Sequence, residues 1–491
     1  MLDKISRIVV VSMILTTVTL GDVVATAQQN TNQASTNSTV SSCIDGNWEG
    51  TLTIGQNKLR LAIRVTKAPD GALIAKFDSI DQGATDLPVD TLTCKDGTVR
   101  FELSNFNITY EGTLNKEKTE ITGQFKQGPI ALPLSFKRIE KATTINRPQH
   151  PQKPYPYHEE EVVYENKKDG IKLTATLTLP RSQGPFPAVV LITGSGPQDR
   201  DESLLGHKPF LVIADYLTRE GIAVLRADDR GVGGSTGNID QSTSENFADD
   251  ALAAVEYLKT RKEINTKQIG LVGHSEGGLI APIVAAKSTD IAFIVMMAGP
   301  GLRGDEILYL QGALISKANG APETAITRNR STQDRVFTVL RQEKDLTIAE
   351  KQLREILNQD LAAMPEEQRR TTNTNEVIDA MVKRYNTPWF RFFINYDPRP
   401  TLKKVKCPVL AINGELDLQV PINENLTAIE AALQAGGNKN YQIVKLPKLN
   451  HLFQTSETGS PMEYGKIEET FSPTALKTIG EWIKKQTGQS H

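Results

Sequence analysis

The most informative stretch of this chain is Gly273-His274-Ser275-Glu276-Gly277-Gly278. It follows the apolar run 269–272, which predicts a buried strand, and precedes the apolar residues 279–281, which predict the start of a helix. In the pattern G-x-S-x-G the turn strains the serine and needs small neighbours, so that the hydroxyl projects above a sheet. The segment therefore predicts that Ser275 is a nucleophile at a strand-to-helix turn. A glycine-rich turn with an incidental serine is the alternative.

Serine needs a base, and the sequence favours His451 for this role. The chain has six histidines, at positions 150, 158, 207, 274, 451 and 491. The first two fall in a predicted linker and the last at the C-terminus, while His207 comes too early for the order serine, acid, histidine. We expect the side chain of His274 to point away from the site. His451 remains, after a predicted strand at 442–446; an ordinary core or surface histidine is the alternative.

The acid is expected directly after the preceding strand, 408–412. The segment 413–421 offers Glu415 and Asp417. Asp417 is preferred because the pattern G-x-x-D-x-x-V-P places it past the turn, free to reach the imidazole, whereas Glu415 is interpreted as an ordinary loop carboxylate. An aspartate in this role fixes the tautomer of the histidine and stabilises the imidazolium during proton transfer.

Acyl transfer also needs donors for a developing oxyanion. One is predicted to be the backbone N–H of Glu276, and the other the backbone N–H of Ser195, since Gly194 and Gly196 let that loop approach closely. A phosphate-binding loop is disfavoured because the spacing G-x-G-x-x-G and a P-loop lysine are missing there. The segment 228–235 also looks like a nucleotide loop, but we expect a structural turn held by an internal aspartate–arginine pair.

Strands and helices alternate after residue 188, which is typical of a mostly parallel sheet with helices on both faces. Strands are expected at 188–193, 222–226, 268–272, 291–296, 408–412 and 442–446, and helices at 210–220, 246–262, 424–434 and 473–485. At about 302–400 helical stretches replace this alternation, which predicts a helical lid insertion. Its aromatic residues Trp389, Phe390 and Phe393 are interpreted as a wall of an apolar substrate pocket. Packed lid core is the alternative.

The N-terminus predicts export. Residues 1–27 combine Lys4 and Arg7, an apolar run at 8–20 and a small-x-small site that ends at Ala27, which is typical of a cleaved signal peptide. We therefore expect a periplasmic or secreted protein. The apolar run is too short to span a bilayer, so a membrane anchor is the weaker alternative.

Three segments lie between the signal peptide and the sheet domain at 159–491. A polar flexible tether is expected at 28–42, and a β-rich domain of short alternating strands, a sandwich or small barrel, at 43–140. The Pro-rich stretch 141–158 is predicted to be a semi-rigid linker.

Composition restricts the possible partners. The 491 residues carry 56 Lys and Arg against 58 Asp and Glu, a net charge of −2, with no dense basic block in the mature region, so nucleic acid is not expected to bind. Cysteines 43, 94 and 407 form no C-x-x-C pair, which argues against a zinc cluster or a redox dithiol. In an oxidising compartment Cys43 and Cys94 would be able to pair; two unpaired thiols are the alternative.

From about residue 160 to the C-terminus the sequence resembles the α/β-hydrolases. The likeness rests on the motif at 273–278, on D-x-R-G-x-G-x-S at 228–235, and on the G-x-x-D and N-H-x-F segments that contain Asp417 and His451. The sequence is most similar to bacterial serine esterases of the EstD type, which carry a small β-rich N-terminal domain before the hydrolase domain. The segment D-S-I-D-Q-G at 78–83 resembles part of that N-terminal domain. The resemblance implies an α/β-hydrolase fold with a helical lid, preceded by a small all-β domain, and carboxylic ester hydrolysis by a triad of Ser275, Asp417 and His451.

The expected partner is a small-molecule ester of short or medium acyl chain, without cofactor or metal and without a stable membrane span after cleavage. The oligomeric state is not predicted. Serine aminopeptidases resemble the same catalytic domain, so peptide or amide hydrolysis is an alternative; Glu366-Glu367 is the adjacent acidic pair of the lid that a free amino terminus would need. A non-catalytic protein that binds a ligand or glycan is the alternative of a different class.

Overall fold

The structure is a computed structural model, and it describes residues 44–54, 57–68, 73–82, 84–128, 130–143, 145–363 and 374–489. The predicted signal peptide and tether lie outside these residues, as do Cys43 and the Glu366-Glu367 pair. Among the described helices, none has the length and apolar character needed to cross a membrane.

The chain divides into two compact units. Of the described residues, one unit comprises those up to Asn146, Leu204–Gly206 and those within Arg354–Val382. The other comprises Arg147–Ser203, His207–Leu353 and those from Lys383 onward. The domain boundaries expected at 43, 140 and 158 stay predictions.

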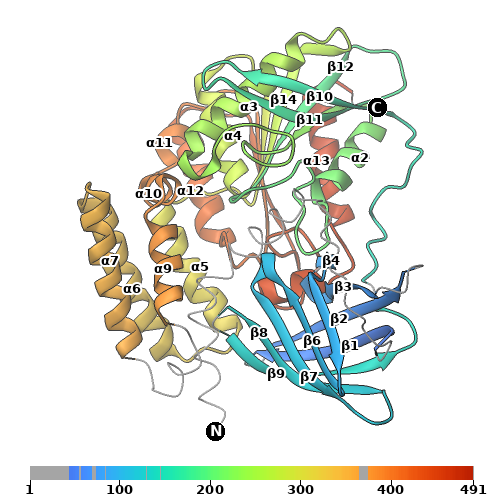
Figure 1. Cartoon of the computed structure of the whole chain (residues 1–491). Coiled ribbons are helices and arrows are strands. Elements are labelled where there is room, and N and C mark those ends of the chain that lie inside the picture. Colours follow the sequence, from blue (N-terminus) through green and yellow to red (C-terminus); the bar gives the residue numbers. More distant parts are fainter. Residues whose placement is uncertain are drawn as a thin grey trace. The chain divides into compact units, whose positions relative to one another are not determined.

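The first unit is built on one antiparallel sheet, whose strands follow the order β4-β3-β2-β1-β9-β8-β7-β6-β5 (Figure 1). Its strands are β1 (Gly46–Ile54), β2 (Asn57–Lys67), β3 (Leu73–Ser79), β4 (Ala84–Pro88), β5 (Thr91–Lys95), β6 (Thr98–Leu103), β7 (Ile108–Leu114), β8 (Glu120–Gln127) and β9 (Ile130–Ile139). The alternation in the sequence predicts strands at 51–54, 59–65, 72–78, 99–103, 108–113, 120–125 and 132–136, which correspond to all of these except β4 and β5. Those two strands are short and lie at the edges of the sheet, where few of their side chains are buried.

An aromatic core covers one face of this sheet, because successive side chains of a strand point to opposite faces. Phe101 stacks on Tyr110 with ring centroids 5.1 Å apart, and Tyr110 meets the edge of Phe136 at the same distance. The buried Tyr110 hydroxyl is satisfied by the carbonyl oxygens of Ile121 and Leu134, each at 3.1 Å. Cys94, which packs against this core, is disulfide-bonded.

The second unit contains a mixed sheet of eight strands in the order β10-β11-β13-β12-β14-β15-β16-β17. Its six predicted parallel strands are β12 (Phe186–Ile192), β13 (Ala223–Ala227), β14 (Ile264–His274), β15 (Phe293–Met297), β16 (Val409–Gly414) and β17 (Tyr441–Leu446). An antiparallel hairpin of β10 (His158–Asn166) and β11 (Ile171–Leu179) extends the sheet and was not predicted. In β10 exposed and buried residues alternate, so this edge strand lacks a continuous apolar run.

Part of the predicted linker is fixed against the second unit. The Arg147 guanidinium donates to the carbonyl oxygens of Gly465 and Ile467, both at 2.7 Å, and the Gln149 side chain bonds the backbone of Thr470 and Phe471. The chain is therefore anchored about ten residues before β10 begins.

Helices cover both faces of the eight-stranded sheet (Figure 1). In β12, Val189 and Leu191 pack with α2 (Pro209–Arg219) and α13 (Pro473–Gln486) on one face. Ala188, Val190 and Ile192 alternate with them and pack with α3 (Ser244–Lys259), α4 (Glu276–Lys287) and α12 (Ile422–Ala435) on the other. This is the α/β-hydrolase fold that the sequence predicted.

The helical lid insertion lies between β15 and β16, as expected. Its helices are α5 (Gly304–Ala318), α6 (Glu323–Gln342), α7 (Leu346–Ala362), α9 (Thr374–Tyr385), α10 (Pro388–Asn395) and α11 (Arg399–Leu402). The Thr387 hydroxyl caps α10 by accepting the N–H of Phe390 at 3.2 Å, and Pro388 at the first position favours the helix start. Helix α10 packs against α5, α6 and α3.

Candidate active site

Ser275 occupies a sharp turn between β14 and α4. Its φ is +53°, an uncommon value for a residue with a side chain, and its N–H donates to the Met297 carbonyl at 2.8 Å. The neighbouring glycines are required by packing. A Cβ on Gly277 would lie 2.1 Å from the carbonyl oxygen of Ile192, and one on Gly273 would lie 2.0 Å from that of Gly277. The turn leaves Ser275 partly exposed at the start of a helix, as the G-x-S-x-G pattern predicts.

The structure brings His451 and Asp417 together. His451 Nδ1 lies 2.9 Å from Asp417 Oδ2, and both side chains are buried. Asp417 Oδ1 accepts the backbone N–H groups of Gln419 and Val420 at 2.8 and 2.9 Å, which fixes the carboxylate in its loop after β16. Glu415 is exposed. Of the two carboxylates that the sequence offered, Asp417 is the one that contacts the histidine.

The expectation that His274 points away from the site is wrong. Its ring lies against that of His451, with centroids 4.9 Å apart, and its Nε2 is 3.0 Å from the His451 carbonyl oxygen. Its Nδ1 is 2.9 Å from Glu202 Oε1. The side chain at x in G-x-S-x-G is thus turned inward, because a buried carboxylate on the loop after β12 meets it there. Because His274 directly precedes Ser275 in the chain, its contacts with His451 place His451 beside the Ser275 turn.

The loop 193–198 carries the predicted oxyanion donor Ser195. Gly194 lies next to Ser275, since a Cβ on Gly194 would be 3.4 Å from that of Ser275. The N–H of Gly194 donates to Glu202 Oε1 at 2.7 Å and is therefore engaged, whereas Ser195 follows it on a partly exposed stretch. The second predicted donor, the N–H of Glu276, is in the first turn of α4, where backbone N–H groups have no partner within the helix.

The side chain of Glu276 is buried beneath the lid. Its Oε1 accepts the Ser244 hydroxyl at 2.6 Å and the Trp389 indole N–H at 2.7 Å. Its Oε2 is buried and has no hydrogen-bond partner among the described residues. Burial raises the pKa of Glu276 and outweighs the opposite effect of the two donors.

The three aromatic residues predicted to line the substrate pocket have different surroundings. Trp389 is partly exposed and stacks on Phe393, with ring centroids 5.2 Å apart. Phe390 is buried within the lid against Phe337 and Tyr385. Phe390 therefore fits the alternative of packed lid core, and Trp389 is the member of this group that contacts the residue after Ser275.

Comparison of the sequence with known proteins identifies the family of this chain. Residues 169–448, more than half of the chain, match the X-Pro dipeptidyl-peptidase (S15) family. The chain belongs to the S15 family. It is also 27% identical over 391 residues to esterase EstD of Thermotoga maritima, which covers 78% of this chain and 80% of that protein. An acyl-coenzyme A thioesterase 1 of mouse is 30% identical over 162 residues, covering 32% of this chain and 33% of the mouse protein.

Solved structures similar to this S15-family protein include an esterase of Pyrococcus furiosus. It is 17% identical, covers 71% of this chain and 99% of its own, and has a TM-score of 0.41. Together with the sheet order and the family match, the site identifies a hydrolase of the α/β-hydrolase superfamily.

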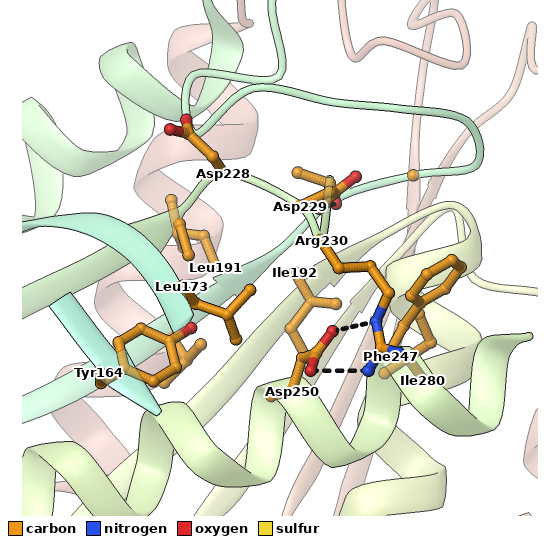
Figure 2. Close-up of a pocket in the computed structure, with 15 residues that line it drawn as sticks. Tyr164, Leu173, Leu191, Ile192, Asp228, Asp229, Arg230, Phe247, Asp250 and Ile280 are labelled. Carbon is orange, nitrogen blue, oxygen red and sulfur yellow. Dashed lines mark hydrogen bonds and ion pairs between the residues drawn. The ribbon is translucent and has the colours of Figure 1, made fainter. Parts of the chain in front are cut away.

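The turn 228–235 of the S15-family chain is held by ion pairs, but not by the expected internal one. Asp228 forms a bidentate pair with Arg200, at 3.0 and 2.8 Å, while Arg230 pairs with Asp169 and Asp250. The side chains of Asp228 and Arg230 diverge, and Figure 2 shows the Arg230–Asp250 pair. Asp228 and Arg230, two positions apart in the sequence, therefore attach the turn to different parts of the fold.

A cavity lined by both polar and apolar side chains lies beside this turn (Figure 2). Its volume is about 50 Å³, which is enough for about three or four water molecules, and its lining includes Tyr164, Thr193, Asp229, Asp250 and Ile280. Asp229 accepts the Thr193 hydroxyl at 2.7 Å and the Gln198 N–H at 3.0 Å. Burial raises the pKa of Asp229 well above its usual value despite these donors. Since Thr193 and Gln198 flank Ser195, Asp229 holds both ends of the loop that carries the predicted oxyanion donor.

Sequence reasoning missed Glu202, Asp229 and Ser244 as parts of this site. Each of them bonds a side chain that lies 32 to 72 positions away, so that spacing along the chain carries no signal for the contact. Glu202 has a φ of +51°, which no sequence pattern indicated. Within the described residues, no group of three or more His, Cys, Asp and Glu side chains is arranged to hold a metal ion.

Proposed function

We propose that this protein is an exported serine hydrolase that cleaves carboxylic esters of short or medium acyl chain through an acyl-enzyme. The observation that carries this proposal is the hydrogen bond between His451 and Asp417, close to a strained Ser275 turn. A buried aspartate that accepts Nδ1–H leaves Nε2 of the imidazole unprotonated, which is the form that a general base needs.

In the proposed reaction, Ser275 attacks the ester carbonyl while His451 takes up its proton. The negative charge that develops on the carbonyl oxygen would be stabilised by the backbone N–H groups of Ser195 and Glu276. His451 then donates its proton to the leaving alcohol, and a water molecule activated by the same histidine releases the acid from Ser275. No cofactor is required by these steps.

The similarity to esterase EstD over most of both chains supports an ester as the substrate. The stacked Trp389 and Phe393 support an apolar acyl pocket near Glu276. The near-neutral charge of the chain is compatible with a substrate that is recognised by apolar contacts.

The proposal is tested by the hydrolysis of p-nitrophenyl esters from acetate upward, with Ser275→Ala beside the unaltered protein. We expect activity to fall to the background rate in this variant, about 10⁶-fold in kcat, because the nucleophile is lost. Ser288→Ala, at the other end of α4, is the matched control. Full activity of Ser275→Ala would contradict the assignment of Ser275 as the nucleophile. Failure of Ser275 to react with a fluorophosphonate probe would favour a non-catalytic protein that binds a ligand or glycan.

Peptide hydrolysis is a second candidate, because the matching family is described as X-Pro dipeptidyl-peptidases. It predicts cleavage of aminoacyl-prolyl p-nitroanilides by the same Ser275. Preference for these substrates over p-nitrophenyl esters in kcat/KM would favour the peptidase. The reverse preference, with aminoacyl amides left intact, would favour the esterase.

Export is tested separately from catalysis. The full chain, produced in a bacterial host, is expected in the periplasm or medium with Gln28 as its first residue, since cleavage is predicted after Ala27. Recovery of an uncleaved protein from the cytoplasm would contradict this part of the proposal.

A further inference from the structure

Both ring nitrogens of His274 face hydrogen-bond acceptors. Nδ1 lies 2.9 Å from Glu202 Oε1, and Nε2 lies 3.0 Å from the carbonyl oxygen of His451. A carbonyl oxygen has no proton to donate, so the second contact requires a proton on Nε2.

The first contact favours a second proton on the ring. Glu202 Oε1 already accepts the backbone N–H of Gly194 at 2.7 Å, and the same oxygen is able to accept a second N–H from the ring. That is the behaviour of an ionised carboxylate, and Nδ1 is then the donor. An imidazole with protons on both nitrogens carries a positive charge.

The carboxylates around His274 favour this charge. Glu202 faces Nδ1, the His451 ring lies beside its own, Asp417 lies beyond His451, and Phe453 presents its ring at 6.2 Å. Burial lowers the pKa of His274, but the Glu202 carboxylate, its hydrogen bond and the more distant Asp417 outweigh burial, so that the net shift is upward. Both partners of the pair are buried, with side chains 7% and 8% exposed.

The backbone of Glu202 indicates that its position is imposed by the surrounding structure. Its φ of +51° lies in the left-handed region, which is unfavourable for a residue with a side chain. Such conformations persist where surrounding contacts hold them, often at functional sites. In this protein the conformation places Glu202 Oε1 between the N–H of Gly194 and the ring of His274.

We propose that Glu202 and His274 are positioning residues, a buried ion pair that holds the catalytic groups in register and places a positive charge beside Ser275. The Glu202 carboxylate fixes Gly194, and with it the loop of Ser195. The His274 imidazolium fixes the backbone of His451 and favours the negative charge that develops during attack on the ester. The catalytic part of this inference rests on the proposed function, whereas the charge of His274 does not.

The charge is tested by nuclear magnetic resonance on protein labelled with ¹⁵N-histidine. The His274 signals are assigned by replacing the other five histidines one at a time. At pH 7.5 we expect both ring nitrogens of His274 to be protonated in the unaltered protein. A neutral ring with one N–H at that pH would overturn the proposal, whatever the protein hydrolyses.

The positioning role is tested by kinetics of Glu202→Gln, which keeps the size of the side chain and removes its charge. We expect kcat to fall about 10- to 100-fold with KM within about twofold, since the interaction acts in the transition state. Glu202→Asp should restore part of the loss. Glu220→Gln, the same chemical change at the C-terminal end of α2, should match the unaltered protein. Unchanged kcat in Glu202→Gln, or equal losses in Glu202→Gln and Glu202→Asp, would contradict the positioning role.

The two proposals fail in different ways. If Ser275→Ala retains full activity, the proposed function fails, and the NMR result on His274 still decides whether the buried charge exists. If Glu202→Gln does not fold, the NMR measurement on the unaltered protein decides the charge alone.

Discussion

The indole N–H of Trp389 donates to Glu276 Oε1 at 2.7 Å, and this contact joins the lid to the residue that follows Ser275. Trp389 belongs to α10, and Glu276 is the first residue of α4. The lid helix is therefore fixed by a side chain whose own backbone is a proposed oxyanion donor. Packing of Trp389 on Phe393 adds an apolar surface at the same place.

Replacing Trp389 by Phe should weaken this junction. The variant keeps an aromatic ring but loses the N–H, which leaves the buried Glu276 carboxyl with one donor, so we expect a loss of about 1–3 kcal/mol in unfolding free energy. Acyl-chain preference in the p-nitrophenyl ester series should change as well. Trp482→Phe, in α13, is the control for loss of ring size, and a change of preference in that variant too would contradict a specific role for Trp389.

Glu276→Gln should make the stability of the protein fall less as pH rises. Burial raises the pKa of Glu276 in the folded state, so the folded protein binds a proton that the unfolded chain releases. The stabilisation from that proton is present below the unfolded pKa and is lost as pH rises through the folded pKa. Melting temperatures measured from pH 4.5 to 8 should therefore shift in favour of the variant as pH rises. A constant difference across this range, as expected for the exposed control Glu245→Gln, would rule out the buried ionisation.

Asp228→Asn should destabilise the turn 228–235 at neutral pH. Arg200 would keep its charge beside an uncharged partner, and loss of one member of a buried pair costs about 3 kcal/mol. Burial alone would raise the pKa of Asp228, but Arg200 outweighs it and the net shift is downward. The stabilisation is thus present above the unfolded pKa and is lost as pH falls through the folded pKa.

Urea unfolding at pH 7 and at acid pH measures this effect. The difference between Asp228→Asn and the unaltered protein should shrink at the lower pH. Glu161→Gln removes an exposed carboxylate that contacts the same Arg200 at 3.4 Å, and it should have little effect at either pH. Equal losses of unfolding free energy in the two variants would contradict a larger contribution of the bidentate Asp228–Arg200 pair to stability.

Asp417→Asn should reduce kcat about 10⁴-fold, because asparagine no longer favours the His451 tautomer that accepts a proton from Ser275. KM should change little, since Asp417 is buried behind the histidine. The matched control is Glu415→Gln, an exposed carboxylate two residues earlier, which should retain its rate. A similar loss in both variants would contradict the choice of Asp417.

Much of the fold follows from local patterns in the sequence. Continuous apolar runs such as 188–192 are buried strands because both of their faces are covered by helices. The strands β4, β5 and β10 were missed because these edge strands bury few residues and lack such runs. The strand β11 lies inside the sheet and is mostly buried, but threonines at 174, 176 and 178 interrupt its apolar residues. The assignment of His451 and Asp417 depended on the order of elements, which places both after strands that end at one edge of the sheet.

The surroundings of these residues were not predictable in the same way. The sequence indicated an aspartate–arginine pair within 228–235, but Asp228 and Arg230 point to different partners, 28 and 20 residues away. It also placed His274 outside the site, because the motif alone does not show that Glu202 lies 2.9 Å from the ring.

The amino-acid sequence by itself determined the α/β-hydrolase fold, the turn at Ser275 and the order of acid and base, because these depend on local backbone geometry and hydrophobic periodicity. Only the tertiary structure decided which buried polar side chains meet: Glu202 with His274, Arg200 with Asp228, and Glu276 with Trp389. Burying a polar group is costly unless a partner is present, and that partner can come from any element that folding brings within about 3 Å.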